Sequence, residues 1–348
     1  MDANKAKVIS FINLKGGVGK TSTAINIADA LSRDNLKVLV IDMDPQFNAT
    51  QALLNHQFMY HKNEIEEALL LSVYEEAKEK YEEVVSPSGE VQVEESEQHD
   101  GSNKDNYKKE ILSQLIYNRL KAKGMTVKSL FMKKDVVLKP ENLSLVYNLK
   151  DNLDLIPGDL DLFESLYGDT SGKHNVLDDH FNKYELRKNY DYIIIDCPPN
   201  WTILTQASLF ASDHYIIPSK IDLFSSIGIA LLSNLVNDTF YNEDSRIISV
   251  YNILRNNISR PSIKALGILF TLTHDMTIES KLKRTLQRDI NLPFFDTEIP
   301  YQSSVPLKFS LYDESGAKHD ALKNSITRVV LEIRRLVEDD SEGEHEKD

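Results

Sequence analysis

The residues with the clearest chemistry lie near the N-terminus, in a short segment rich in lysine and glycine. Its sequence is Lys15-Gly16-Gly17-Val18-Gly19-Lys20-Thr21, followed by Ser22. Glycines let backbone N–H groups curl around phosphate oxygens, because no Cβ stands in the way. The lysine before the hydroxyl reaches the β- and γ-phosphates of a nucleotide, and the hydroxyl ligates Mg²⁺. We therefore predict a nucleotide-binding loop in which Lys20 meets the phosphates and Thr21 the metal.

The segments on either side of this loop have the pattern that a phosphate-binding loop requires. Residues 8–12 form a short apolar, β-branched run, and Ile25, Ala28 and Leu31 then recur at helical spacing. The loop is therefore expected to join a strand to a helix that starts near Lys20. The positive end of that helix dipole would face the bound phosphates.

Two further apolar runs end on aspartates that could complete the site. Residues 37–41 lead into Asp42, with Asp44 two residues later, and residues 192–195 lead into Asp196. A carboxylate at a strand end can hold Mg²⁺ through a bound water, because the strand fixes its position. Asp42 and Asp44 are expected on the same side of the chain.

The elements that must position these residues alternate along the sequence. Apolar runs suited to strands buried on both faces occur at residues 8–12, 37–41, 153–156, 192–195, 215–217 and 266–270. Helical patterns separate these runs. The alternation predicts an α/β fold, namely a doubly wound, mostly parallel sheet flanked by helices.

One region does not follow this alternation. We expect a single main domain made of residues 1–55 and 140–337, with an insertion at residues 56–139. Within the insertion, residues 86–106 are rich in Ser, Gly, Glu and Gln, and residues 75–100 are acidic. Both compositions favour disorder, because they offer little apolar surface to bury.

Two amphipathic segments lie outside the strand pattern. A stripe at helical spacing comprises Ile111, Leu112, Leu115, Ile116 and Leu120. The stripe predicts a helix but leaves open whether it packs on the main body or on a partner. The last helix, at residues 325–337, is expected to pack against the sheet. Residues 338–348 are expected to be an acidic, disordered tail.

The formal net charge of −14 is localised rather than spread over the chain. Residues 75–100 carry a local net charge of −8 and residues 338–348 carry −6, so the remainder is formally neutral. A basic face for nucleic acid therefore stays possible. The single cysteine, Cys197, excludes an internal disulfide and favours a reducing, cytoplasmic compartment. The sequence shows neither a secretory signal pattern nor an apolar stretch long enough to span a membrane, so neither feature is expected.

Taken together, the motifs resemble the ParA branch of the ParA/MinD superfamily. The usual GxxxxGK[ST] pattern requires glycine where this chain has Leu14, and Lys15 instead gives the deviant Walker-A form, KGGxGK[ST]. Residues 42–50 read DMDPQFNAT and residues 191–199 read DYIIIDCPP. Looser similarity follows at residues 294–300 and 312–317. The resemblance covers about residues 7–55 and 150–335, and it implies a P-loop ATPase that uses ATP and Mg²⁺.

The resemblance also implies roles for individual residues. Asp196 matches the Walker-B aspartate, and Asp44 matches the catalytic aspartate that orients the attacking water near the metal. Lys15 matches the signature lysine, which reaches across a two-fold interface to nucleotide in the partner, so a homodimer around two ATPs is expected. Thr271 and Pro300 fall near the adenine.

A partition ATPase of this kind also implies non-specific DNA binding and a ParB-like centromere-binding partner on the nucleoid. Phosphate contact requires exposed cations. The candidates are Arg255, Arg260, Lys281, Arg284 and Arg288, the last three of which share one helical face.

Three other functions of the same fold remain as alternatives. A MinD-like positioning ATPase needs a basic amphipathic C-terminal helix, whereas this chain ends in an acidic segment that anionic lipid would repel. An iron–sulfur reductase needs at least two cysteines per subunit. A carboxylating synthetase is not expected to carry the DPQxN and DxxGA motifs found here.

Overall fold

A central sheet organises the chain. The computed structural model describes residues 6–61, 65, 68, 71–73, 75–76, 100–132, 144–166, 172–257, 260–274, 276–303, 311–312 and 319–345. Within them the strands are β1 Lys7–Phe11, β2 Val38–Asp42, β3 Tyr147–Lys150, β4 Leu153–Ile156, β5 Tyr192–Asp196, β6 His214–Ser219, β7 Lys264–Thr273 and β8 Ile299–Pro300. They form an eight-stranded sheet in the order β3-β4-β2-β5-β1-β6-β7-β8. Every pairing is parallel except the one between β3 and β4.

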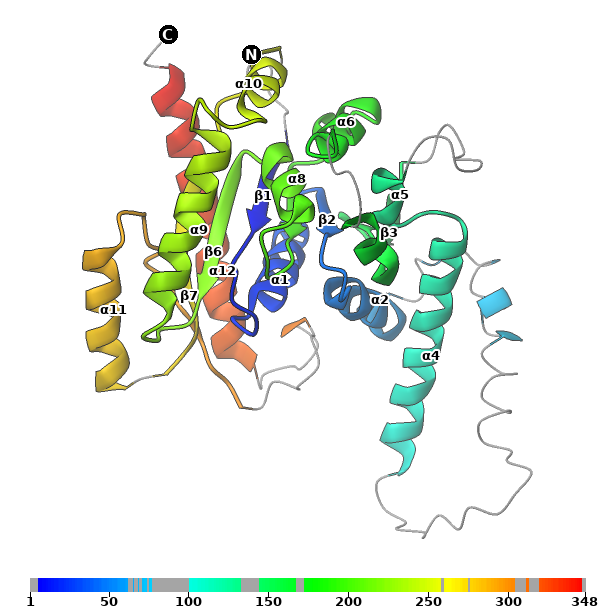
Figure 1. Ribbon diagram of the computed structural model, residues 1–348. Coiled ribbons are helices and arrows are strands. Elements are labelled where there is room, and N and C mark those ends of the chain that lie inside the picture. Colours follow the sequence, from blue (N-terminus) through cyan, green and yellow to red (C-terminus); the bar gives the residue numbers. More distant parts are fainter. Residues whose placement is uncertain are drawn as a thin grey trace.

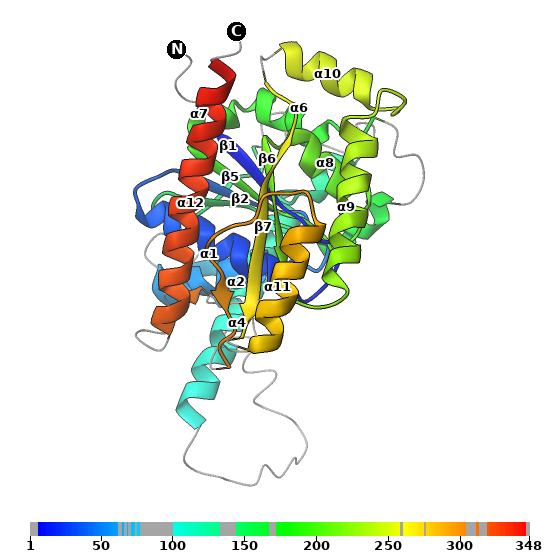
Figure 2. The same ribbon diagram turned by 90° about the vertical axis from the view of Figure 1, so that its left-hand side faces the viewer.

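Helices cover both faces of this sheet (Figures 1 and 2). They are α1 Lys20–Arg33, α2 Asn48–Tyr60, α4 Asp100–Ala122, α5 Lys128–Phe131, α6 Val176–Lys183, α7 Leu186–Asn189, α8 Ile203–Ala211, α9 Ser225–Phe240, α10 Ile248–Asn257, α11 Thr277–Asp289 and α12 Asp320–His345, with a 3-10 helix at Leu160–Leu166. The doubly wound α/β prediction is confirmed. Each of the six apolar runs matches a strand, although the edge strands β3 and β8 were not predicted.

Alternate residues of the central strands feed two separate cores. Ile9, Val40 and Ile194 belong to the core shared with α1, α2, α4 and α12. Their neighbours Val8, Ile41 and Ile193 belong to the core shared with α6, α8, α9 and α10. Because successive side chains of a strand point to opposite faces, a strand covered on both faces must be apolar throughout. This explains the uninterrupted runs in the sequence.

The predicted start of the insertion falls inside a helix, and part of the insertion contributes to the main core. α2 runs on to Tyr60, so the expected boundary between residues 55 and 56 falls inside a helix. Its second half is held down by Gln57, whose side-chain amide donates to the carbonyls of Asn148 and Leu149 at 3.1 and 2.8 Å. The stripe on α4 packs on the main body, where Leu112, Ile116 and Leu120 are all buried.

Two predictions of disorder need correction. α4 begins at Asp100, so residues 100–106 are helical; residues 77–99 lie outside the described residues. The C-terminal helix does not stop at residue 337, because α12 continues to His345 through the acidic stretch. The Asp340 carboxylate lies 2.6 Å from Lys264 and 3.0 Å from His214, at the start of β7 and β6. These two contacts anchor the acidic last part of α12 to β6 and β7.

Candidate functional site

The predicted phosphate loop connects β1 to α1 and has the backbone that glycine permits. Gly17 and Gly19 have φ angles of 68° and 75°, a left-handed region that other residues rarely adopt. α1 begins directly after Gly19, so the first N–H groups of the helix face the loop. Asn13 fixes the loop to the rest of the sheet. Its side-chain oxygen accepts a bond from the Lys15 N–H at 2.8 Å, and its amide donates to the Pro218 carbonyl at 2.7 Å.

Sheet register brings the two strand-end acids beside this loop. Asp196 is the register partner of Phe11, the last residue of β1, and also of Asp42, the last residue of β2. Parallel neighbouring strands therefore end together, and ligands of such sheets bind at their carboxyl ends. The structure thus brings together residues that lie 154 positions apart in the sequence.

Lys20 and Asp196 form the buried centre of the site. The Lys20 ammonium lies 3.6 Å from Asp196, and both side chains are almost inaccessible to solvent. Burial opposes the charge on Lys20, but the carboxylates of Asp196 and Asp44 outweigh it and raise the pKa of Lys20. Burial also raises the pKa of Asp196, an effect that the charge of Lys20 only partly opposes. Neither Asp196 oxygen accepts a hydrogen bond from the described residues.

The two aspartates after β2 have different surroundings. One Asp42 oxygen accepts bonds from the Thr50 N–H and hydroxyl, both at 2.8 Å, and the other accepts from the Asp44 N–H at 3.2 Å. Burial and the nearby Asp196 raise the pKa of Asp42 to about 8. Asp44 is also buried, and one of its oxygens accepts the Gln46 N–H at 3.0 Å. Asp42 therefore organises the segment that carries Asp44.

This arrangement fits a magnesium-bound triphosphate. The carboxyl groups of Asp42, Asp44 and Asp196 are buried and all favour the charge of the buried Lys20 ammonium, and Thr21 follows Lys20 at the start of α1. Buried charge of one sign requires compensation, which a divalent cation can supply. No cluster of three or more His, Cys, Asp or Glu side chains that could hold a metal unaided occurs in the described part of the chain. Magnesium commonly takes few protein ligands and completes its shell with phosphate and water.

Lys15, by contrast, points away from this buried centre. Its ammonium lies 2.5 Å from the Asp222 carboxylate, and 42% of its side chain is exposed. Asp222 follows β6, and Asp42 and Asp196 likewise close β2 and β5. Neither the role of Asp222 nor the tether at Asn13 was predicted from the sequence. Asn13 directly follows the apolar run at residues 8–12, which is a signal that could have found it, whereas Pro218, Ser219, Lys220 and Ile221 separate Asp222 from the run at residues 215–217.

The two residues expected near adenine lie in different settings. Thr271 is fully buried behind the loop, and its hydroxyl donates to the Val18 carbonyl at 2.6 Å. A base contact by this hydroxyl is therefore not supported; Thr271 supports the phosphate loop instead. Pro300 is half-buried on β8, next to Tyr301, whose N–H donates to Thr273 at 2.8 Å. Most of the loose motif at residues 312–317 lies outside the described residues.

Two of the five candidate DNA-binding cations need correction. Arg255 and Arg260 are buried and bonded to groups inside the fold. Arg255 donates to the Ser212 and Pro261 carbonyls, and Arg260 pairs with Asp178 at 2.6 Å and Asp213 at 3.0 Å. Both arginines hold the ends of strands together, and neither can reach a phosphate without leaving these partners.

The other three candidate cations share the exposed face of α11. Lys281, Arg284 and Arg288 are all exposed, and Leu286 and Leu282 anchor the opposite face to the core. Arg288 lies 2.7 Å from its neighbour Asp289, a contact at the surface. This helix lies at the left-hand edge of the molecule in Figure 1 and faces the viewer in Figure 2. Among the described residues, no helix is long and apolar enough to cross a membrane.

The sequence matches one protein family and is similar to a chromosome partitioning protein. The AAA_31 family model, described as an AAA domain, matches residues 6–248. The chromosome partitioning protein ParA of Caulobacter vibrioides is 26% identical over 238 residues, which cover 68% of this chain and 64% of the relative.

Two solved structures share the fold across nearly the whole chain. A plasmid partition protein from Borrelia burgdorferi, bound to AMPPNP, aligns with a TM-score of 0.54 at 20% identity, covering 94% of this chain and 98% of the other. The ATP complex of a variant of McdA from Cyanothece aligns with a TM-score of 0.56 at 20% identity, covering 94% and 97%. At this identity the likeness establishes the fold and no more.

Proposed function

The chain belongs to the AAA_31 family and is an ATPase of the ParA type, and from that premise we propose that it partitions DNA. ATP and Mg²⁺ bind at the loop between β1 and α1, two copies close around the nucleotides, and the closed dimer binds DNA without reading its sequence. A ParB-like protein then accelerates hydrolysis and releases the dimer. The cycle would take place in the cytoplasm, on the nucleoid.

The observation that carries this proposal is the different placement of the two lysines of the loop. Lys20 lies in the buried centre beside Asp196, where it can neutralise bound phosphate. Lys15 lies at the surface of the same loop. A surface lysine beside a phosphate site can serve nucleotide bound to a second copy, much as an arginine finger acts in trans.

The surface next to Lys15 suits contact with another copy. Leu223, Phe224 and Ile227 follow Asp222 closely, and they are 71, 73 and 66% exposed. Contiguous exposed apolar side chains favour a protein interface. An isologous dimer uses the same surface of both copies. Burying this surface would therefore bring the two phosphate loops together if the copies met face to face across the loop.

In this cycle Asp44 orients the attacking water, and positioning is the main task because phosphoryl transfer needs little covalent help. Thr21 would hold Mg²⁺ with phosphate oxygens, and Asp196 would hold it through water. Magnesium would supply charge neutralisation at the β- and γ-phosphates. Thr271 and Asn13 keep the loop in place.

The C-terminal helix gives no support to a membrane-bound role. Ile326, Val329, Val330 and Ile333 form the apolar face of α12 and are already buried in the core. An interfacial helix needs such a face for lipid.

DNA co-sedimentation tests the proposal directly. The protein is mixed with DNA of unrelated sequences in the presence of ADP or of a slowly hydrolysed ATP analogue. We expect retention with the analogue alone. Asp44→Ala should retain DNA with ATP itself, because it should bind and dimerise without turnover. Equal retention in both nucleotides would contradict nucleotide-dependent DNA binding. Normal turnover by Asp44→Ala would contradict the catalytic role of Asp44.

A further inference from the structure

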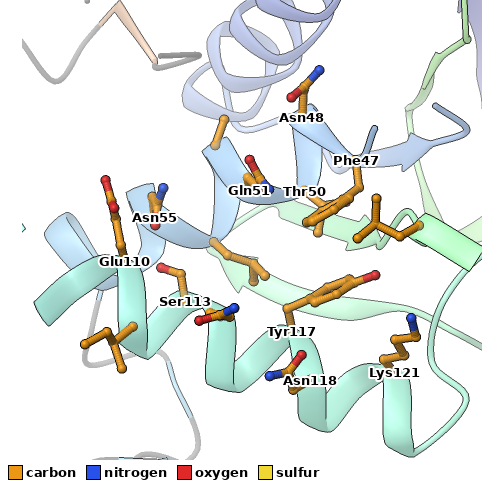
Figure 3. A pocket seen from close by; sticks show the side chains of 15 residues that line it. Phe47, Asn48, Thr50, Gln51, Asn55, Glu110, Ser113, Tyr117, Asn118 and Lys121 are labelled. Atoms are coloured by element: carbon orange, nitrogen blue, oxygen red, sulfur yellow. The ribbon is translucent and has the colours of Figure 1, made fainter. Parts of the chain in front are cut away.

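One aromatic contact connects the insertion to the segment that carries Asp44. The ring of Tyr117 on α4 stacks on the ring of Phe47, with centroids 4.8 Å apart and planes 8° apart. Figure 3 shows the two rings facing each other, Phe47 at the start of α2 and Tyr117 on the helix opposite. Both line a cavity of about 670 Å³ between α2 and α4. Tyr117 is 7% exposed, and Phe47 is partly buried and packs against the same core.

Phe47 has a backbone conformation that needs such support. Its φ and ψ are 43° and 36°, in the left-handed region that a bulky residue rarely adopts. A strained residue of this kind persists only where its surroundings determine it. Its N–H donates to the Asp44 carbonyl at 2.8 Å, and its own carbonyl accepts the Gln51 N–H at 3.0 Å. Phe47 therefore closes the turn from Asp44 and starts α2.

The opposite side of Phe47 is fixed by backbone. A Cβ added at Gly158 would lie 2.9 Å from the Phe47 Cβ and 3.0 Å from the Asp42 carboxylate, so only glycine fits there. The Gly158 N–H donates to the Thr50 hydroxyl at 2.8 Å, and that hydroxyl donates to Asp42. The main domain thus restrains the Cβ side of Phe47 and leaves its ring to the insertion.

Tyr117 is held firmly enough to restrain that ring. Four neighbours on α4 are buried in the core that α2 shares, namely Leu112, Leu115, Ile116 and Leu120. At the end of the helix, Lys121 lies 3.3 Å from Asp159 and 2.8 Å from Asp161, and Thr126 donates to Asp159 at 2.6 Å. Asp159 directly follows Gly158, so α4 is tied to the same turn that contacts Phe47.

We propose that Tyr117 is a positioning residue for ATP hydrolysis, which rests on the proposed function. Its stack holds Phe47 in the left-handed conformation, and Phe47 in turn sets the direction in which Asp44 presents its carboxylate. The insertion is therefore part of the hydrolytic machinery through one ring. Displacing a reacting group by about 1 Å can slow an enzyme by about 100-fold, so a small relaxation of this turn is sufficient to matter.

The test compares Tyr117→Leu with Tyr117→Phe in the full chain. Single-turnover ATP hydrolysis gives the chemical rate, and titration with a slowly hydrolysed ATP analogue gives the affinity. We expect Tyr117→Leu to lower the rate by about 10- to 100-fold with unchanged affinity, because the two rings lie on α4 and at the start of α2, whereas the phosphate loop joins β1 to α1. Tyr117→Phe should restore the rate, because it keeps the ring and loses only the hydroxyl.

Tyr147→Leu is the matched control. Tyr147 also packs near α2, where its hydroxyl donates to Gln57 at 3.0 Å, but it has no part in the turn after Asp44. Its loss should leave hydrolysis unchanged. Phe47→Leu provides a second way to remove the stack, useful if Tyr117→Leu fails to fold, and it should give the same drop. The double variant should be no slower than either single one.

The outcomes separate two failures. A wild-type chain that does not hydrolyse ATP contradicts the proposed function and this inference with it. A wild-type chain that does hydrolyse ATP, with a normal rate in folded Tyr117→Leu or Phe47→Leu, overturns the positioning role alone. An equal loss in Tyr147→Leu would also overturn it, since the effect would then belong to packing of the region in general.

Discussion

The Lys15 ammonium lies 2.5 Å from the Asp222 carboxylate of the same chain. In the free subunit, therefore, the lysine expected to act on a partner's nucleotide is held by its own chain. The side chains of Lys15 and Asp222 are both partly exposed, so their ion pair is weak. Lys15 can therefore leave Asp222 and bind phosphate instead. Desolvation opposes the charge on Asp222, but the hydrogen bond and charge of Lys15, together with bonds from the Phe224 N–H and the Ser225 side chain, outweigh it and lower the pKa of Asp222.

Removing this contact should change association more than stability. Asp222→Asn keeps the size of the side chain and frees Lys15, and the free energy of unfolding should change by less than about 1 kcal/mol. We expect ATP-dependent dimers at lower protein concentration, because the lysine no longer leaves a partner in order to bind. Sedimentation velocity with a slowly hydrolysed ATP analogue measures this. Glu185→Gln, in the exposed pair with Lys188, is the control. Weaker dimers in Asp222→Asn would mean that Asp222 itself belongs to the interface.

The two buried arginines beside Asp213 should make the stability of the fold depend on pH in the acid range. Asp213 lies between Arg187 and Arg260, at 2.8 and 3.0 Å. Desolvation alone would raise the pKa of Asp213, but the two guanidinium groups outweigh it and hold the pKa far below its usual value. An acid whose pKa is depressed by folding contributes stability above its unfolded pKa of about 3.9, and this contribution is lost as pH falls.

Asp213→Asn should therefore lower the free energy of unfolding by about 3–5 kcal/mol at pH 7, because it removes the carboxylate bonded to the buried Arg187 and leaves the buried Arg260 with Asp178 alone. The difference from wild type should shrink progressively below about pH 5. Urea denaturation at several pH values checks both statements. Asp34→Asn, which removes an exposed contact with Arg334, should have little effect at any pH. A difference that stays constant down to acid pH would contradict the argument.

The exposed face of α11 should carry much of the DNA affinity. Arg284→Glu with Arg288→Glu removes two cations from that face and adds two acids. Binding in the ATP-analogue state should weaken, and the slope of log affinity against log salt should fall in magnitude by about 2. Lys183→Glu with Lys188→Glu makes the same change in charge on α6 and α7. Equal loss in both pairs would indicate a general charge effect, and no loss in the first would place the DNA elsewhere.

The sequence by itself determined the sheet and the position of the phosphate site. Apolar runs without alternation suit strands covered on both faces, and residues 15–21 together with the acids after residues 41 and 195 mark the carboxyl ends of three of them. These signals are local, because they depend on neighbours within a few positions.

Only the tertiary structure decided which charged side chains are available for chemistry. Arg260 looked like a free cation, but its partners Asp213 and Asp178 lie 47 and 82 positions away in the sequence. Asp340 looked like part of a solvated tail until β6 and β7 supplied His214 and Lys264. Nothing in the sequence indicated that the rings of Tyr117 and Phe47 stack on each other. Residue type fixes what a side chain can do, whereas burial and distant partners fix whether it is free to do it, and these depend on how the whole chain packs.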